Sequence, residues 1–232
     1  MKKSAFTMLE LVFVIVVIGI LSVVIVPKFG QHKLSEAANQ LMSHIRYTQH
    51  LALVDDQYDP NDPTWFKKRW TLRLKKDLVY TGGYTPNGTY SDVWSYTVYS
   101  DASKDGNPNL SEMARNPLNK NQYLSGGYNN VLHENSSSSM KELRLGEKYS
   151  IADIIFSGGC RSNVLYVYFD HLGRPFNSFT NTSPYESASP GFHKLLTSRC
   201  DITLCTTNCL TATKNEKLVI GIEPETGYVH LI

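Results

Sequence analysis

The fold of this chain depends on the stretch Phe6-Thr7-Met8-Leu9-Glu10-Leu11-Val12-Phe13-Val14-Ile15-Val16-Val17-Ile18-Gly19-Ile20, which opens an apolar run that continues to Val26. The run stops at Pro27. A helix over 6–26 would be about 30 Å long, the thickness of a bilayer's hydrocarbon core. Glu10 is the one charge inside the run. A carboxylate deep in a bilayer costs roughly 2.5–3.5 kcal/mol, so we expect Glu10 to have a partner.

Three interpretations compete for this stretch. A cleaved secretory signal peptide is disfavoured, because the apolar run is too long and no small-x-small cleavage site follows Val26. A plain membrane anchor accounts for every residue except Glu10. The third interpretation is a precursor that is cut just before the apolar run and then assembled through it.

This third interpretation rests on a resemblance to the type IV pilin-like family. The stretch resembles that family's motif of a short basic leader, a cut just before Phe, and Thr-x-x-Glu after the cut. Pro27 also lies where the family's helix usually carries its Pro, whereas Ala5 departs from the Gly that the family has before the cut. The matching residues are Lys2, Lys3, the Ala5-Phe6 bond, Thr7 and Glu10.

The resemblance implies a processing route and a role for the acid. A prepilin peptidase would remove leader 1–5 and methylate the new amino terminus at Phe6. Glu10 would then pair with the Phe6 ammonium of a neighbouring subunit as the fibre assembles. Opposite charges attract strongly in a low-dielectric medium, and either charge left alone there is costly.

The charge balance predicts where each part of the chain lies. The 232 residues include 23 basic and 21 acidic side chains, and the excess of two equals Lys2 and Lys3. Without the leader the chain is neutral and has no global attraction to nucleic acid. Lys2 and Lys3 predict a cytoplasmic N-terminus by the positive-inside rule. We therefore expect a single-pass bacterial inner-membrane protein with a periplasmic globular domain, which later joins a pilus or pseudopilus.

Helical periodicity resumes after Pro27 with one apolar face. We predict one helix over 6–54, with a membrane-spanning part over 6–26, a kink at Pro27 and an amphipathic part over 27–54. A separate amphipathic helix after a break at Pro27 is the alternative. The face is formed by Leu34, Ala38, Leu41, Ile45, Thr48 and Ala52.

We predict that residues 55–232 form one β-rich globular domain, with a polar excursion over about 100–141. The expected class is α+β and pilin-like, with the long N-terminal helix packed on a C-terminal antiparallel sheet. The expected strands are 69–75, 93–99, 152–156, 164–169, 202–206, 218–222 and 228–231.

The first of these strands lies in the densest basic cluster of the chain. Aromatic side chains alternate with the basic ones, and such a mixture can grip phosphates and stack on bases. A solvated sheet face has the same composition, and the neutral mature charge makes us expect no nucleic-acid partner. The candidate residues are Lys67, Lys68, Arg69, Arg73, Lys75 and Lys76.

The excursion contains a candidate calcium loop. Its spacing places oxygen side chains at positions 1, 3, 5 and 9, Gly106 at position 6 and a closing Glu at position 12. Pro108 departs from the apolar residue usual at position 8, and a polar Asp-Gly and Asn-Pro turn would look similar. No cofactor is required by any other motif. The candidate ligands are Asp101, Ser103, Asp105, Asn107, Asn109 and Glu112.

Four cysteines follow in the C-terminal third. Two disulfides are expected, and we favour Cys160–Cys200 with Cys205–Cys209 because the first would tie distant strands. A zinc site is the rival, although no Cys-x-x-Cys is present. The chain has no Gly-x-Ser-x-Gly motif, phosphate loop or His-x-x-x-His helix, so we expect no enzyme.

Two C-terminal segments resemble the GspH/FimT pseudopilin branch of the family. One is Val167–Pro175, like its strand and turn Phe-Asp-x-x-Gly-Arg-Pro, and the other is Leu218–Val229, like its closing hairpin with Thr-Gly. The resemblance implies a minor pilin or pseudopilin, at or near the tip of a type II secretion pseudopilus or a type IV pilus. Its expected partners are the prepilin peptidase, other pilins and the inner-membrane assembly platform. The alternative is a filament-displayed minor pilin that binds DNA or another ligand.

Overall fold

The computed structural model describes residues 8–76, 79–81, 89–91, 93–129, 131–161, 165–176 and 195–232, without the side chains of 22–31, 79–81 and 89–91. The predicted cleavage bond between Ala5 and Phe6 therefore lies outside the described residues, as does the methylation site. Leader 1–5 lies outside them too. Nothing in the structure bears on these predictions.

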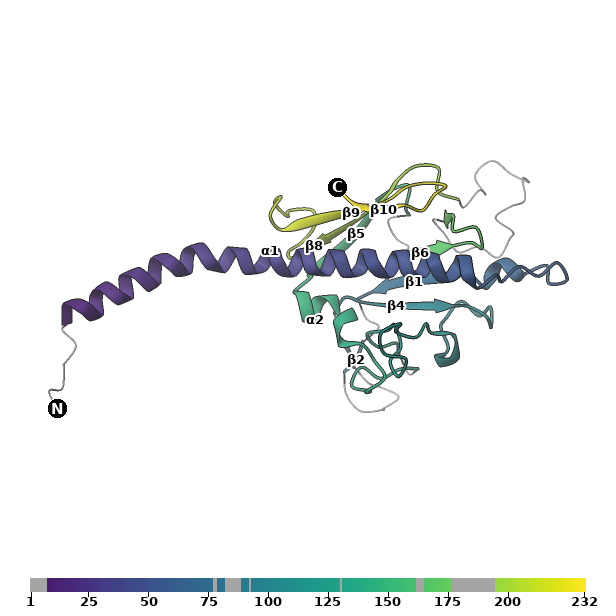
Figure 1. The fold of residues 1–232 in the computed structure, drawn as a ribbon, viewed down its shortest axis with the longest axis horizontal. Coiled ribbons are helices and arrows are strands. Elements are labelled where there is room, and N and C mark those ends of the chain that lie inside the picture. The colour runs from purple at the N-terminus through teal and green to yellow at the C-terminus, as the bar shows by residue number, and fades with distance from the viewer. Residues whose placement is uncertain are drawn as a thin grey trace.

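One long helix organises the molecule. Helix α1 spans Met8–Val54 and continues without interruption past Pro27. Its 47 residues make it about 70 Å long. Figure 1 shows that its first half projects away from the rest of the molecule in a gentle curve, whereas its second half lies along the sheets. The pattern of apolar residues explains the second half, since Leu34, Leu41 and Ile45 are almost fully buried.

The described part of the chain contains no helix long and apolar enough to cross a membrane. This finding contradicts the prediction of a transmembrane segment over 6–26. It likewise corrects the expected localisation as a single-pass inner-membrane protein with a cytoplasmic N-terminus and a periplasmic domain.

Two antiparallel sheets flank α1, so the class is α+β. The first sheet has the order β4-β1-β6-β7, formed by Ser95–Ser100, Trp70–Lys75, Tyr166–Phe169 and Pro175–Phe176. The second has the order β10-β9-β8-β5, formed by Val229–Leu231, Lys217–Ile222, Cys200–Cys205 and Asp153–Gly158. A separate hairpin joins β2 (Val79–Thr81) to β3 (Thr89–Ser91), and the short helix α2 spans Leu145–Tyr149. Single 3-10 turns lie at Trp65–Lys67, Leu110–Glu112 and Lys141–Leu143.

The core lies between α1 and both sheets. Leu72 of β1 is paired across the first sheet with Val98 and Val167, so one row of apolar side chains faces the helix. Ile202 and Ile220 face each other in the second sheet. All five side chains are at most 2% exposed. Burying one such side chain contributes about 1.5–3 kcal/mol, so this layer holds the packed half of α1 firmly.

The segment after β4 is more ordered than its polar composition predicts. Described residues of 101–141 pair with the edge strand β4 through isolated antiparallel bridges, Thr97 with Ser125 and Tyr99 with Met113. They form a small core of their own from Met113, Tyr123, Tyr128 and Leu132. The apolar side chains are too widely spaced in sequence to show a period, which is why composition alone indicated a surface excursion.

Candidate assembly site

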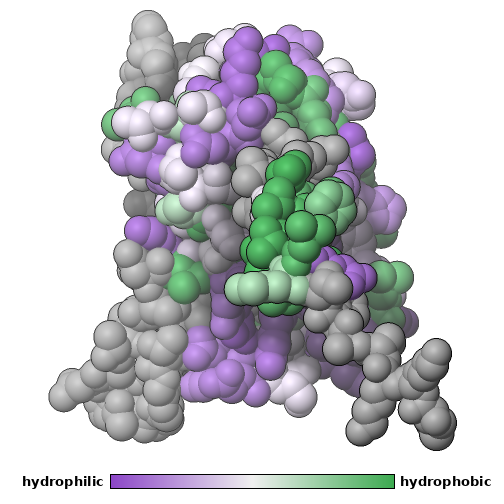
Figure 2. All heavy atoms as spheres, turned by 90° about the vertical axis from the view of Figure 1, so that its left-hand side faces the viewer, coloured by the Kyte–Doolittle hydropathy of each residue, from purple (hydrophilic) through white to green (hydrophobic). Residues whose placement is uncertain are grey.

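The projecting half of α1 exposes apolar side chains all round the helix. Met8, Leu9 and Phe13 are 86%, 82% and 70% exposed. Figure 2 shows a group of hydrophobic side chains in front of a mostly hydrophilic end of the domain. Continuous apolar surface of this kind marks an interaction site. Within the described residues, nothing in the chain folds back to cover it.

Glu10 lies on this projecting half, in the first turn of the described helix. Its side chain is exposed. An acid in the first turn interacts favourably with the helix dipole, so Glu10 is compatible with the helix start. Its expected partner, the amino group of Phe6 in a neighbouring subunit, lies outside the described residues.

A partly buried polar cluster fixes the packed half of α1 to the first sheet. Gln40 Nε2 donates to the Tyr96 hydroxyl oxygen at 3.0 Å, and His44 Nδ1 lies 2.7 Å from the same oxygen. Tyr149 donates to Gln40 Oε1 at 2.5 Å. Burial lowers the pKa of His44 to about 4 and raises the pKa of Tyr96 far above its usual range. His44 is therefore neutral at pH 7 and can accept the Tyr96 hydroxyl proton.

Gln49 joins α1 to the two segments that resemble the pseudopilin branch. Its Nε2 donates to the carbonyl oxygens of Gly173 at 2.8 Å and Thr226 at 2.7 Å. Gly173 and Gly227 both have positive φ, at 73° and 63°. A side chain on Gly227 would meet the Gly173 carbonyl oxygen at 2.9 Å. The two turns thus meet at one helix side chain, and glycine is required for them to approach.

The turn before Gly173 is stabilised by a buried acid. Asp170 Oδ1 accepts hydrogen bonds from the backbone N–H groups of Leu172 and Arg174, at 3.0 and 2.8 Å. The Arg174 guanidinium donates to Asp170 Oδ2 at 2.8 Å. On the helix side, Arg46 donates to the Val229 carbonyl oxygen at 2.6 Å. The Asp170 bonds hold the turn in shape, and the Gln49 and Arg46 bonds hold α1 against the domain.

Neither Gln49 nor Arg46 was singled out from the sequence. Both lie at the margin of the apolar face of the helix, where polar residues are ordinary. Their partners are backbone carbonyls more than 120 residues away. No sequence pattern signals such a contact.

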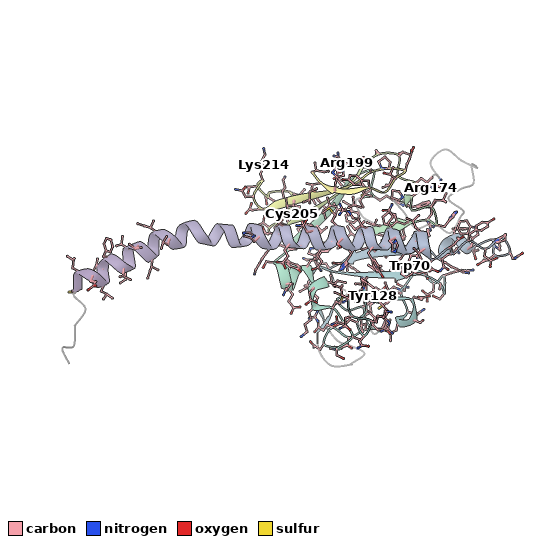
Figure 3. The ribbon with its side chains drawn as sticks, in the orientation of Figure 1. Trp70, Tyr128, Arg174, Arg199, Cys205 and Lys214 are labelled. Carbon is pink, nitrogen blue, oxygen red and sulfur yellow. A yellow bond between two sulfur atoms is a disulfide. The ribbon has the colours of Figure 1, made fainter. Side chains whose placement is uncertain are left out.

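The candidate nucleic-acid residues do not form one exposed surface. Arg69 is 5% exposed, and its Nε donates to the Phe66 carbonyl oxygen at 2.6 Å. The Arg73 guanidinium lies 4.8 Å from the Tyr166 ring and donates to the Tyr128 hydroxyl at 2.6 Å. Figure 3 shows Tyr128 beneath the first sheet, in the segment that covers it. The two arginines therefore stabilise internal layers by cation–π contacts.

The lysines of that cluster lie on different elements of the fold. Lys68 pairs with Asp62 at 3.3 Å, and Lys104 donates to the same carboxylate at 2.5 Å. Lys67 ends the 3-10 turn before β1. Lys75 ends β1 and Lys76 follows it. The interaction of Lys68 and Lys104 with Asp62 joins the loop after α1 to the loop after β4.

The candidate calcium loop is folded by its own hydrogen bonds. Asp101 Oδ2 accepts from the N–H of Gly106 at 2.9 Å, and Gly106 has φ of +85°. Glu112 accepts from the N–H groups of Ser103 at 2.6 Å and Asn109 at 2.8 Å. Asp105 Oδ1 accepts from the N–H of Asn107 at 2.8 Å. Most of the candidate ligand oxygens thus already accept protein hydrogen bonds.

One oxygen of the loop is different. Asp101 is 3% exposed, and among the described residues its Oδ1 has no hydrogen-bond partner. Burial and the nearby carboxylates of Glu112 and Asp105 raise the pKa of Asp101. The described residues contain no group of three or more His, Cys, Asp or Glu placed to hold a metal ion.

The structure confirms the two disulfides that we favour from the sequence. Cys160, just after β5, is bonded to Cys200 at the start of β8. Cys205, at the end of β8, is bonded to Cys209 in the following loop. The backbone N–H of Cys209 donates to Asp153 Oδ2 at 3.0 Å, which holds that loop against β5. With all four sulfurs in disulfides, the zinc alternative has no cysteine ligands.

Comparisons with protein-family models, with curated proteins and with solved structures found no match for this chain.

Proposed function

We propose that this chain is a minor pilin or pseudopilin, a structural subunit that is added to a fibre through the projecting half of α1. The observation that carries the proposal is the combination of an exposed apolar half-helix with a second half anchored to both sheets. Exposed apolar surface of this extent marks a site that a partner covers. Copies of the same kind of helix, stacked side by side, provide that cover.

The proposed route begins with removal of leader 1–5 by a prepilin peptidase and methylation of Phe6. An assembly platform would then bring the helix beside those of other pilins, with Glu10 paired to the Phe6 ammonium of a neighbour. The pairing is strongly favourable only where water is excluded by packed helices. The fibre is a type II secretion pseudopilus or a type IV pilus, with this subunit at or near the tip.

The test is the mass and N-terminal sequence of the chain purified from a bacterium with an active prepilin peptidase. We expect a mature chain that starts at methylated Phe6, and an uncut chain when Ala5 is replaced by Glu. A wild-type chain that starts at Met1 would refute the processing step. Glu10→Ala should be cut normally but be absent from sheared fibres, whereas Ser43→Ala, an exposed change on the packed half of α1, should be present.

Display of a DNA-binding surface is not supported by the arrangement of the basic cluster. Arg69 is buried, and Arg73 is bonded to Tyr128 and Asn107. Phosphate binding needs exposed basic groups that follow one groove. We therefore propose that these two arginines stabilise the domain and do not bind phosphates.

Calcium binding by the loop 101–112 is a separate proposal, supported by the buried and unpartnered Asp101 Oδ1. A hard cation prefers carboxylate and carbonyl oxygens, and bound calcium would neutralise Asp101 beside Asp105 and Glu112. We expect millimolar calcium to raise the unfolding temperature by several degrees, since saturation by 100-fold over Kd adds about 2.7 kcal/mol. Equal magnesium and the variant Asp101→Asn are the controls. An unchanged unfolding temperature in calcium would leave the loop as a polar turn.

A further inference from the structure

The two ends of the domain along α1 differ in chemistry. At the end where α1 stops, residues 53–59 form what we call the distal loop. Leu53, Val54 and Tyr58 are 52%, 69% and 52% exposed there. Asp56 is exposed and Asp59 half-exposed. The distal loop therefore combines apolar and acidic surface.

Two of the four acids near this end are occupied within the domain. Asp55 Oδ2 accepts from Trp70 Nε1 at 3.0 Å, and Asp62 is paired with Lys68 and Lys104. Asp56 and Asp59 instead accept only backbone N–H groups, those of Tyr58 and Asn61. Their charge is therefore not balanced within the described part of the chain, and it faces outward.

The opposite end carries a cavity of about 250 Å³, which we call the proximal pocket. Its apolar lining comes from Leu34, Leu218 and Leu231. Lys214 and Lys217 add two positive charges, and no carboxylate of the described residues forms an ion pair with either. The neighbouring acid, Glu216, accepts only from the neutral N–H and hydroxyl of Thr213, at 2.9 and 2.8 Å, so it keeps its negative charge and the three side chains together carry a net charge of +1.

The pocket and the loop lie at opposite ends of the packed half of α1. Leu34 lines the pocket and Val54 belongs to the loop, so about 30 Å of helix separates them. Figure 3 shows Lys214 at the end of the domain from which α1 projects, and Figure 1 shows the loop after α1 at the other end. In a fibre whose helices all point the same way, the proximal end of one domain faces the distal end of the next.

We propose that the proximal pocket binds the distal loop of a second copy of this chain. The exposed side of Tyr58, whose ring also contacts Trp65 and His171 of its own chain, lies against Leu218 and Leu231, while Asp56 and Asp59 face Lys214 and Lys217. The contact joins two different patches, so it repeats along a line and does not close into a two-fold dimer. It rests on the proposed function for the common direction of the helices, and it adds that two copies of this chain can be neighbours near the tip of the fibre.

Charge complementarity gives this contact its register. Ion pairs at the rim of an interface act mainly on specificity and on the rate of association, whereas the apolar centre provides most of the affinity. The contact should therefore weaken when salt is raised. It should weaken much more when either set of charges is reversed, because like charges would then face each other.

The test uses two charge-reversal variants of the full chain, purified in mild detergent. One carries Lys214→Glu with Lys217→Glu, and the other carries Asp56→Lys with Asp59→Lys. We expect each alone to self-associate at least 10-fold more weakly than the wild type, measured by sedimentation at low salt. Mixing the two should restore association, because each loop then meets a pocket of opposite charge. Recovery on mixing also shows that both variants are folded.

A photo-crosslinking amino acid at position 58 locates the contact. We expect a crosslink to 214–218 of a second copy, identified by mass spectrometry. No recovery on mixing, or a crosslink to another surface or to a different subunit, would overturn the docking proposal. Correct processing at Phe6 with fibre entry in that case would leave the proposed function standing. A chain that is never cut and never enters fibres would overturn both.

Discussion

The imidazole Nδ1 of His44 lies 2.7 Å from the hydroxyl oxygen of Tyr96, at the contact between α1 and the first sheet. Tyr96 is fully buried, and the two rings are tilted at 55° with their centres 5.7 Å apart. His44 therefore contributes both packing and a hydrogen bond in its neutral form. Protonation would place a donor against the hydroxyl and a charge in the interior.

The free energy of unfolding should fall when the pH is lowered through the range in which His44 takes up a proton. The pKa of His44 is lowered from 6.5 to about 4, so the unfolded chain binds the proton more readily than the folded chain. By linkage, the stabilisation is complete above pH 6.5 and is lost as the pH falls through about 4. We expect His44 to account for about 2–3 kcal/mol of that loss. Denaturant unfolding measured from pH 7.5 to 4 checks this.

The variant His44→Gln separates this effect from the titration of carboxylates, which all variants share. Gln keeps a polar group near Tyr96 but does not titrate, so its stability should vary less between pH 6.5 and 4 than that of the wild type. His50 lies on the exposed face of the same helix, and His50→Gln should leave the wild-type profile unchanged. Parallel profiles for wild type and His44→Gln would contradict the assignment.

Gln49→Ala should loosen both turns from α1. The substitution removes two donated hydrogen bonds and leaves the carbonyls of Gly173 and Thr226 without that donor. We expect unfolding to become easier by about 1–3 kcal/mol. Ser43→Ala, at an exposed position on the same helix, should change stability by less than about 0.5 kcal/mol. Equal effects of the two substitutions would mean that the bridge contributes nothing.

The helix and most strands could be predicted because their signals are local. The spacing of Leu34, Ala38, Leu41 and Ile45 marks one face of a helix, and these residues are buried in the structure. Alternation in Trp70–Lys75 likewise marks β1. Short turns account for the antiparallel pairs β6–β7 and β9–β10, whereas β1–β6 and β5–β8 pair strands far apart in the sequence. The assignment of strands to two sheets depends on long-range contacts, which no local period encodes.

The side chains that join the layers were not predictable for the same reason. Arg69 and Arg73 alternate with apolar residues, which is the pattern of a solvated sheet face. The structure instead covers that face with the segment after β4, and the arginines lie against Tyr168 and Tyr166. That cover forms from residues far along the chain. A basic, outward-facing position in a sequence is therefore not evidence of an exposed charge.

The two disulfides should differ in their contribution to stability. Cys160 and Cys200 are 40 residues apart, whereas Cys205 and Cys209 are 4 apart. Closing the longer loop restricts the unfolded chain more, by about 4 kcal/mol against about 2 kcal/mol in the chain-entropy description. We expect Cys160→Ser with Cys200→Ser to lower the denaturation midpoint about twice as far as Cys205→Ser with Cys209→Ser. The reverse order would show that the short loop acts through its contacts with Asp153.

Gly227→Ala should be more harmful than Gly106→Ala, although both residues have positive φ. Backbone strain is common to the two and costs roughly 1–2 kcal/mol for a residue with a side chain. At Gly106 the added carbon meets nothing within 4 Å. At Gly227 it lies 2.5 Å from Gln49 Nε2 and 2.9 Å from the Gly173 carbonyl oxygen, so the turn must move away from α1. We expect a total cost of about 3 kcal/mol or more at Gly227. Denaturant unfolding of both variants measures the difference, and equal costs would mean that the meeting of the two turns is not tight.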